Sequence, residues 1–132
     1  MENGGLPAQK QNAGLLGHGI GMFCDDSRDA IKGSVFDCGD PGFVCGGHEL
    51  EHRILAGARA HCEPDRPIEA PSQIITYVSA HDNLTLWDKL ACILPDEGKR
   101  LRANRFAAAL YMTFQGNLFF LSGEEFARTK QA

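Results

Sequence analysis

Three short apolar runs, each followed by a polar cluster, constrain the fold of this chain more than any other feature. The runs cover residues 20–23, 74–78 and 118–121, and Asp-Asp, His-Asp-Asn and Glu-Glu clusters follow them in that order. The runs lack polar alternation, which favours strands buried on both faces, as in a parallel sheet. Because function gathers at the carboxyl ends of such strands, we expect the three clusters to share one functional face. The alternative is that they are ordinary polar loops.

Helical periodicity lies between the apolar runs. Residues 48–60 carry apolar side chains at helical spacing, and residues 99–114 repeat that pattern after a candidate N-cap at Asp96. A further turn or two of helix is expected over residues 26–32. Strands that alternate with helices predict βαβ units and an α/β fold.

Length and charge exclude several classes of protein. The 132 residues suit one unit, with no second domain, and are too few for a complete eight-stranded α/β barrel of roughly 250 residues. A net charge of -4 argues against nucleic acid as a partner, because phosphate contacts need a basic face. No apolar run approaches the roughly 20 residues that span a bilayer, so no membrane partner is expected.

The cysteines favour free thiols and a reducing compartment. There are five, at positions 24, 38, 45, 62 and 92, and they lack the paired CxxC spacing of a structural zinc site. Most lie beside small or apolar residues, where a thiol behaves as a small hydrophobic group. Residues 1–13 contain no apolar stretch that could act as a secretion signal. We therefore expect a cytoplasmic protein.

One motif suggests a zinc site. Residues 48–52 read His-Glu-Leu-Glu-His and match H-E-x-x-H, in which a helix brings two histidines to one face to bind zinc. Glu51 places a charge at a middle position, and the motif follows two glycines at the start of its helix. His61 and Glu63 are candidates for a third ligand, but nothing in the sequence sets their geometry. We expect His48 and His52 to be solvated rather than metal-bound.

Three stretches resemble one enzyme family. Residues 77–88, Tyr-Val-Ser-Ala-His-Asp-Asn-Leu-Thr-Leu-Trp-Asp, are similar to the fourth signature region of the α-amylase superfamily of glycoside hydrolases. Their Thr-Leu-Trp-Asp ending resembles type I pullulanases, which cleave α-1,6 links. Residues 21–36 and 115–130 resemble the regions around the sixth and eighth strands of the family's barrel. Three ordered stretches at family-like spacing are far more specific than His-Asp alone.

The resemblance implies a retaining glycosidase in a (β/α)8 barrel, without a cofactor. In such enzymes an Asp acts as nucleophile and a Glu as general acid and base, with the carboxyls about 5–5.5 Å apart. Asp82 matches a third acid, which stabilises the transition state, and His81 matches a substrate-binding histidine. Two structural alternatives stay open: Asp82 could cap the following helix, and His81 could be a core histidine.

The family's first three signature regions have no counterpart among residues 1–132. The resemblance therefore implies a partial (β/α)8 barrel of about strands six to eight, without the nucleophile and the general acid. We expect such a chain to be inactive alone and marginally stable or prone to aggregate, because it leaves strand edges open. Its expected partners are α-glucan (pullulan, starch or glycogen branch points) and the missing N-terminal part of the barrel.

Two other functions remain as alternatives. The chain could be a non-catalytic carbohydrate-binding or assembly fragment that pairs with another chain. Less favoured is a small zinc hydrolase that uses His48 and His52.

Overall fold

The computed structural model describes Pro7 and residues 9–130. Three strands, five α-helices and four short 3-10 helices occur within this part of the chain. In chain order they are η1 (Lys10–Asn12), α1 (Ala13–Leu16), β1 (Met22–Phe23), α2 (Asp25–Lys32), η2 (Phe43–Cys45), α3 (Glu51–Ala58), η3 (Pro71–Gln73), β2 (Ile74–Thr76), α4 (Leu86–Ile93), α5 (Glu97–Tyr111), β3 (Asn117–Leu118) and η4 (Glu124–Phe126).

The strands form one parallel sheet in the order β1-β2-β3. Met22 pairs with Ile74, and Thr76 pairs with Leu118. Each strand lies at an apolar run and follows a helical segment, which confirms the expected α/β fold with parallel strands. The strands are shorter than the runs because the chain soon turns away, as at Asp25, where α2 begins.

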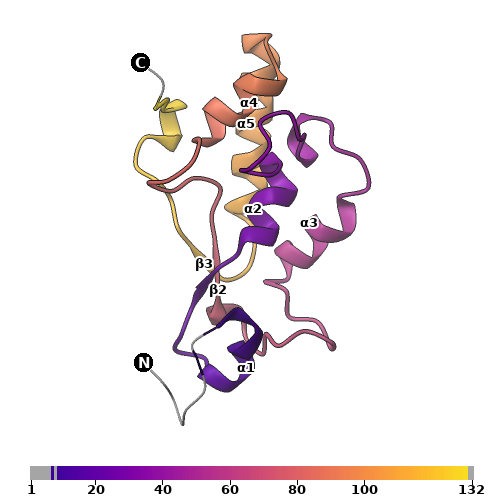
Figure 1. Cartoon of the computed structure of the whole chain (residues 1–132), viewed down its shortest axis with the longest axis vertical. Helices are drawn as coiled ribbons and strands as arrows, with labels where there is room; N and C mark the ends of the chain where they lie inside the picture. The colour runs from indigo at the N-terminus through magenta and orange to yellow at the C-terminus, as the bar shows by residue number, and fades with distance from the viewer. Residues whose placement is uncertain (1–6, 8, 131–132) are drawn as a thin grey trace.

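The main core lies among α2, α4, α5 and the chain after β2. Helix α2 packs against α3, and α4 packs against α5. Figure 1 shows α2, α4 and α5 grouped at the end of the molecule opposite α1. The buried residues of this core are Ile31, Val78, Leu86, Leu90, Ala103, Ala107 and Tyr111.

The helix starts are set by local chemistry. Helix α5 begins after Asp96, whose carboxylate accepts a hydrogen bond of 2.7 Å from the Lys99 amide, so the expected N-cap is confirmed. Helix α3 is shorter than the periodicity of residues 48–60 predicts. Glu49 has a φ of 58°, a left-handed conformation that a right-handed helix cannot contain, so the helix begins only at Glu51.

The two ends of the loop after α2 approach each other closely at two glycines, Gly33 and Gly42. Gly33 has a φ of 90°, and a Cβ there would lie 2.0 Å from the carbonyl oxygen of Asp40. A Cβ on Gly42 would lie 2.3 Å from the Gly33 nitrogen, so both positions require glycine. The same loop receives the buried ammonium of Lys89, which donates to the carbonyls of Asp37 and Cys38.

A disulfide links this loop to α4 and corrects the expectation of free thiols at two positions. Cys38 and Cys92 are bonded, with Cα atoms 5.9 Å apart and a sequence separation of 54. Cys24, Cys45 and Cys62 are free. Sequence spacing could not show this pair, because the two cysteines meet only when α4 packs beside the loop.

One face of the sheet is aromatic and partly exposed. The Phe23 ring lies edge-on to Tyr77 at 5.0 Å and to Phe119 at 5.3 Å between centroids. Phe23 is still 41% exposed. Within the described residues, β1 and β3 each have a strand on one side only. In that same part of the chain, no helix has the length and apolarity to cross a membrane.

Candidate functional site

His81 and Asp82 lie in the turn that follows β2, and both side chains are exposed. The turn connects the carboxyl end of β2 to the start of α4. Asn83, the next residue, has a φ of 60°, which asparagine tolerates better than most residues. The turn therefore presents the two side chains to solvent at the expected end of the sheet.

A single ammonium group holds this turn. The Nζ of Lys130 donates hydrogen bonds to the carbonyls of Ala80 at 2.9 Å, His81 at 2.8 Å and Asn83 at 2.8 Å, and reaches that of Asp82 at 3.4 Å. Hydrogen bonds from a charged donor are about twice as strong as neutral ones. Lys130 thus holds the backbone of both candidate site residues through their carbonyls.

Asp88 on α4 anchors the segment that carries Lys130. Its carboxylate accepts hydrogen bonds from the Thr129 hydroxyl and, at 2.9 Å, from the Lys130 amide. Burial works to raise the pKa of the Asp88 carboxyl, but these hydrogen bonds outweigh it and hold the pKa below its usual value. Asp88 is therefore ionised and keeps the Lys130 segment against α4.

A second lysine, Lys32, also contacts the chain of the turn. Lys32 is almost fully buried, and its Nζ donates to the carbonyl of Leu84 at 2.9 Å. Burial, together with the positive charge of Arg28, lowers the pKa of Lys32 to about 8. The charged form of Lys32 therefore costs stability at neutral pH.

The first acidic cluster, Asp25 and Asp26, is linked to the chain after β2 through Arg28. Its guanidinium donates to the Tyr77 hydroxyl at 2.6 Å, to Asp25 at 3.1 Å and to Asp29 at 2.7 Å. The Tyr77 hydroxyl in turn donates to Asp25 at 2.7 Å. Burial favours a higher pKa of the Asp25 carboxyl, but hydrogen bonds from Lys10 and Tyr77 outweigh it and lower that pKa. The 2.7 Å contact between Arg28 and Asp29 is an internal ion pair.

The third cluster, Glu124 and Glu125, contacts the chain after β2 through Glu124. Its carboxylate accepts a hydrogen bond of 2.5 Å from the Ser79 hydroxyl, and that hydroxyl accepts one of 2.7 Å from the Leu86 amide. Burial raises the pKa of the Glu124 carboxyl above its usual value, although the Ser79 hydrogen bond and the charge of Lys32 oppose the rise. Glu124 thus orders the chain between β2 and α4.

The chain after β2 therefore contacts both other clusters, through Tyr77 to Asp25 and through Ser79 to Glu124. This confirms only the expected closeness of the clusters, and one functional face stays a prediction. Asp26 departs from it, because its carboxylate lies 3.6 Å from both Arg53 and Arg66, away from the turn.

Neither structural alternative for the two site residues fits. The N-cap of α4 is Thr85, whose hydroxyl accepts from the Asp88 amide at 3.1 Å, so Asp82 does not cap the helix. His81 is exposed and not a core residue. Trp87 is half-buried, and the guanidinium of Arg100 lies 4.9 Å from its ring centroid, which leaves that ring face covered.

The H-E-x-x-H segment lacks the geometry of a zinc helix. His48 precedes α3 while His52 lies on it, so no helical turn relates the two. His52, His61 and Glu63 do line a common cavity of about 430 Å³, together with Arg53 and Arg66. Within Pro7 and residues 9–130, no group of three or more His, Cys, Asp or Glu side chains could hold a metal ion.

Sequence reasoning missed the residues that hold the turn. Lys32 and Lys130 carry no local pattern that marks them as ligands of backbone carbonyls, which lie 47 to 52 residues away in sequence. The signal that includes Lys130 is the stretch of residues 115–130 that resembles the glycosidase family.

Comparison with known proteins relates the chain to one group of enzymes. No family model matches the chain. The chain is similar to the pullulanase of Bacillus subtilis (strain 168), with 43% identity over 119 residues, which cover 86% of this chain and 16% of that protein. It is also similar to pullulanase A of Streptococcus pneumoniae, with 31% identity over 85% of this chain and 9% of that protein. The chain therefore spans about a sixth or less of the length of these two relatives.

Solved structures agree with the sequence comparison. A pullulanase from Paenibacillus barengoltzii complexed with maltotetraose matches with a TM-score of 0.88 and 38% identity, over 96% of this chain and 20% of that one. The type I pullulanase of Bacillus subtilis complexed with maltose matches with a TM-score of 0.79 and 41% identity, over 86% of this chain and 17% of that one. The same Paenibacillus enzyme has been solved with maltohexaose and α-cyclodextrin.

Proposed function

This chain is homologous to pullulanases over most of its length, and from that premise we propose that it is part of a retaining debranching glycosidase that hydrolyses α-1,6-glucosidic bonds. Residues 1–132 would form an incomplete (β/α)8 barrel, equivalent to about strands six to eight. The nucleophile Asp and the general-acid Glu would lie outside these residues. The three parallel strands and the match to pullulanase structures support this proposal.

Asp82 would stabilise the transition state. Glycoside hydrolysis passes through an oxocarbenium-like state, in which a fixed carboxylate and hydrogen bonds to sugar hydroxyls gain strength. The observation that carries this role is the turn itself: Lys130 holds its backbone, while the Asp82 side chain is exposed and is not the N-cap of α4. The backbone that carries this carboxylate is held before substrate binds, and the side chain remains available to substrate.

His81 would bind the same sugar unit. Its backbone carbonyl accepts from Lys130, and its ring is exposed beside Asp82. The ligand would be an α-glucan such as pullulan, starch or glycogen, and solved relatives complexed with maltotetraose, maltohexaose and α-cyclodextrin support that class. No cofactor takes part in this proposal.

The isolated chain would be inactive. A retaining enzyme needs two carboxylates about 5–5.5 Å apart, one as nucleophile and one as acid and base, and Asp82 supplies neither function. Release of maltotriose units from pullulan by the purified chain would contradict this part of the proposal.

A segment replacement tests the roles of both residues. Residues 1–132 would replace the matching segment of the Bacillus subtilis pullulanase, and kcat and KM would be measured on pullulan. We expect an active chimera in which Asp82→Asn lowers kcat by about 10²–10³-fold, the usual cost of removing a transition-state contact. His81→Ala is expected to raise KM more than it lowers kcat.

The matched control is Asp65→Asn, at an exposed loop position away from the turn. It should leave both kinetic constants unchanged. If the chimera folds and binds maltotetraose but Asp82→Asn retains full kcat, the role of Asp82 is wrong.

Assembly with another chain is the second candidate function. The single-sided pairing of β1 and β3 within the described residues and the exposed aromatic face favour it. Mixing the chain with a separately expressed remainder of a pullulanase would then restore activity, and Asp82→Ala would abolish it. A mixture without activity or complex formation would count against assembly.

A cytoplasmic location stays a prediction. Stable disulfides are rare in reducing compartments, and the Cys38–Cys92 bond therefore weighs against it.

A further inference from the structure

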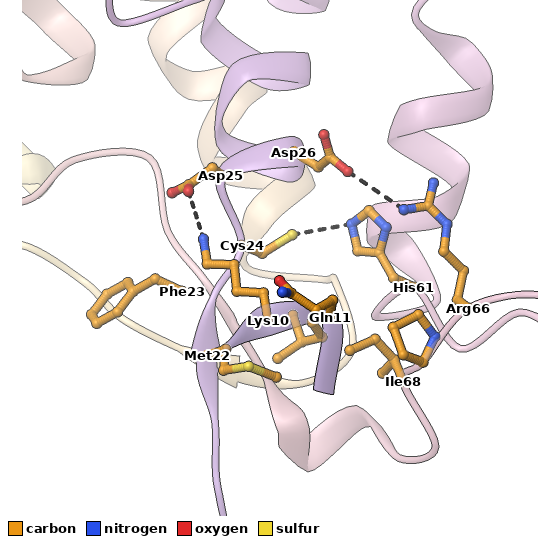
Figure 2. A pocket seen from close by; sticks show the side chains of 12 residues that line it. Lys10, Gln11, Met22, Phe23, Cys24, Asp25, Asp26, His61, Arg66 and Ile68 are labelled. Atoms are coloured by element: carbon orange, nitrogen blue, oxygen red, sulfur yellow. Dashed lines mark hydrogen bonds and ion pairs between the residues drawn. The ribbon is translucent and has the colours of Figure 1, made fainter. Parts of the chain in front are cut away.

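Cys24 lies where β1 passes into α2, in the wall of a cavity of about 390 Å³. It is the residue directly before the first turn of α2, an eight-residue helix. Figure 2 shows its sulfur directed at His61, with Met22 and Ile68 below them in the view. The volume falls within the usual range of small-molecule pockets. This cavity is separate from the turn that carries Asp82.

A histidine and a serine surround the sulfur. The Cys24 Sγ lies 3.1 Å from the His61 Nε2 and 3.3 Å from the Ser27 Oγ. The Ser27 Oγ is also 3.0 Å from the same His61 nitrogen. An imidazole at this distance can take the thiol proton and then donate a hydrogen bond to the thiolate.

The position of Cys24 directly before α2 also favours its thiolate form. The first amides of a helix point toward this position and carry partial positive charge. Burial opposes ionisation, but the hydrogen bonds from His61 and Ser27 outweigh it and lower the pKa of the Cys24 thiol. In return, the hydrogen bond to Cys24 raises the pKa of His61, against the effect of its own burial.

The other charges around the pair are already paired with each other. Arg66 lies 3.6 Å from Asp26, and Lys10 contacts Asp25, and all four line the cavity. Asp26 supports a protonated His61, while Arg66 opposes it. Since both belong to one ion pair, their effects on the imidazole largely offset each other.

The other free thiols have backbone partners instead. Among the residues that the structure describes, Cys45 donates only to the carbonyl of Gly42, and Cys62 only to that of Ala60. Burial raises the pKa of both thiols. They provide an internal reference for the reactivity of Cys24.

We propose that Cys24 and His61 form a reactive pair that accepts a small thiol from a low-molecular-weight disulfide. The Cys24 sulfur, its proton held by His61, attacks one sulfur of the disulfide. A new sulfur–sulfur bond forms to Cys24 as the original one breaks, and the departing thiolate takes up a proton. One disulfide is consumed and one is formed, so the exchange needs no further oxidant. This proposal does not depend on the glycosidase function.

The experiment uses the full chain with Cys38 and Cys92 oxidised and 4,4′-dithiodipyridine, an uncharged disulfide, as the probe. The modified residues are identified by peptide mass spectrometry after short reaction times. We expect Cys24 to react about tenfold faster than Cys45 at pH 7, because hydrogen bonds from His61 and Ser27 favour the Cys24 thiolate while burial disfavours that of Cys45. Equal or slower reaction of Cys24 would overturn the proposal.

His61→Asn tests the pair directly. His61 has a φ of 54°, and asparagine tolerates that left-handed backbone. The substitution should slow Cys24 by about tenfold and leave Cys45 and Cys62 unchanged. An unchanged Cys24 rate in a folded variant would overturn the role of His61.

The pH dependence of the unmodified chain gives a test that needs no variant. Between pH 6 and 8 the rate at Cys24 should rise less steeply than the rate at Cys45, because more of the Cys24 sulfur is already ionised. Parallel pH profiles for the two cysteines would contradict the pair.

Discussion

Lys130, although exposed, makes several hydrogen bonds to the backbone around His81 and Asp82. Its ammonium donates to the carbonyls of residues 80, 81 and 83, and its own amide is held by Asp88. A charged group that bonds several carbonyls at once positions a turn more firmly than neutral hydrogen bonds would. The ordering of the candidate site therefore comes from a residue outside the site.

Lys130→Met tests this positioning. The substitution keeps an unbranched side chain but removes every hydrogen bond that the Lys130 ammonium donates to the turn. We expect amide hydrogen exchange in residues 81–84 to become at least about tenfold faster, because even one hydrogen bond to a charged group contributes about 1.5 kcal/mol or more. Mass spectrometry of exchanged peptides measures this.

Lys99→Met, at an exposed position on α5, is the matched control and should leave those amides unchanged. Exchange as slow in Lys130→Met as in the unmodified chain would show that the turn is held by other contacts.

Lys32 predicts how stability changes with pH. Its folded pKa of about 8 lies below the ordinary value of 10.5, so the unfolded chain binds more protons between these pH values. The free energy of unfolding should therefore rise between pH 8 and pH 10, by about 2 kcal/mol. Above pH 10 the trend should reverse, because burial raises the pKa of Tyr77 to about 12 and the folded chain then binds more protons.

Urea unfolding at pH 7, 8, 9 and 10 measures this dependence, and Lys32→Met should remove most of the rise. Burial also lowers the pKa of Lys89, and hydrogen bonds lower that of the Cys24 thiol, so both groups contribute to any rise that remains in the variant. An equal rise in Lys32→Met would mean that Lys32 is not its source.

At the scale of elements, boundaries agree with sequence patterns where local chemistry sets them. The Asp96 cap and the three apolar runs lie where their patterns predict. The patterns were less informative where the backbone leaves regular geometry. Glu49 has a left-handed φ, which delays α3 and separates His48 from His52. No periodicity in residues 48–60 indicates that conformation.

The Asp96 cap gives a prediction for α5. Asp96→Ala removes the acceptor of the Lys99 amide at the start of the helix. We expect the free energy of unfolding to fall by about 1 kcal/mol, the usual effect of losing an N-cap. Denaturant unfolding monitored by circular dichroism measures it.

Asp65→Ala, in an exposed loop, serves as the control and should change stability little. Equal stability of Asp96→Ala and the unmodified chain would show that the Lys99 amide finds another acceptor.

At the scale of the whole molecule, the sheet has outer strand edges and an aromatic face that the described residues leave exposed. Its outer strands pair on one side only within the described residues, and Phe23 on the aromatic face is 41% exposed. Unpaired strand edges and exposed apolar side chains both promote association between chains.

We expect the isolated chain to associate as its concentration rises. Light scattering across a concentration series should show increasing mass, and Phe23→Ser should reduce the increase. A monomer at every concentration, with one sharp cooperative unfolding transition, would contradict both this prediction and the expectation of marginal stability.

The sequence by itself determined the order of elements, the parallel strands, the start of α5 and the resemblance to pullulanases. These depend on patterns within a few residues or on motifs that can be compared directly. Tertiary structure alone decided the Cys38–Cys92 bond, the contacts of Lys130 with the turn and the meeting of Cys24 with His61. Their partners lie 54, 47 to 50 and 37 residues apart. Local propensity does not extend over such separations, and these groups meet only because packed helices and strands bring their segments together.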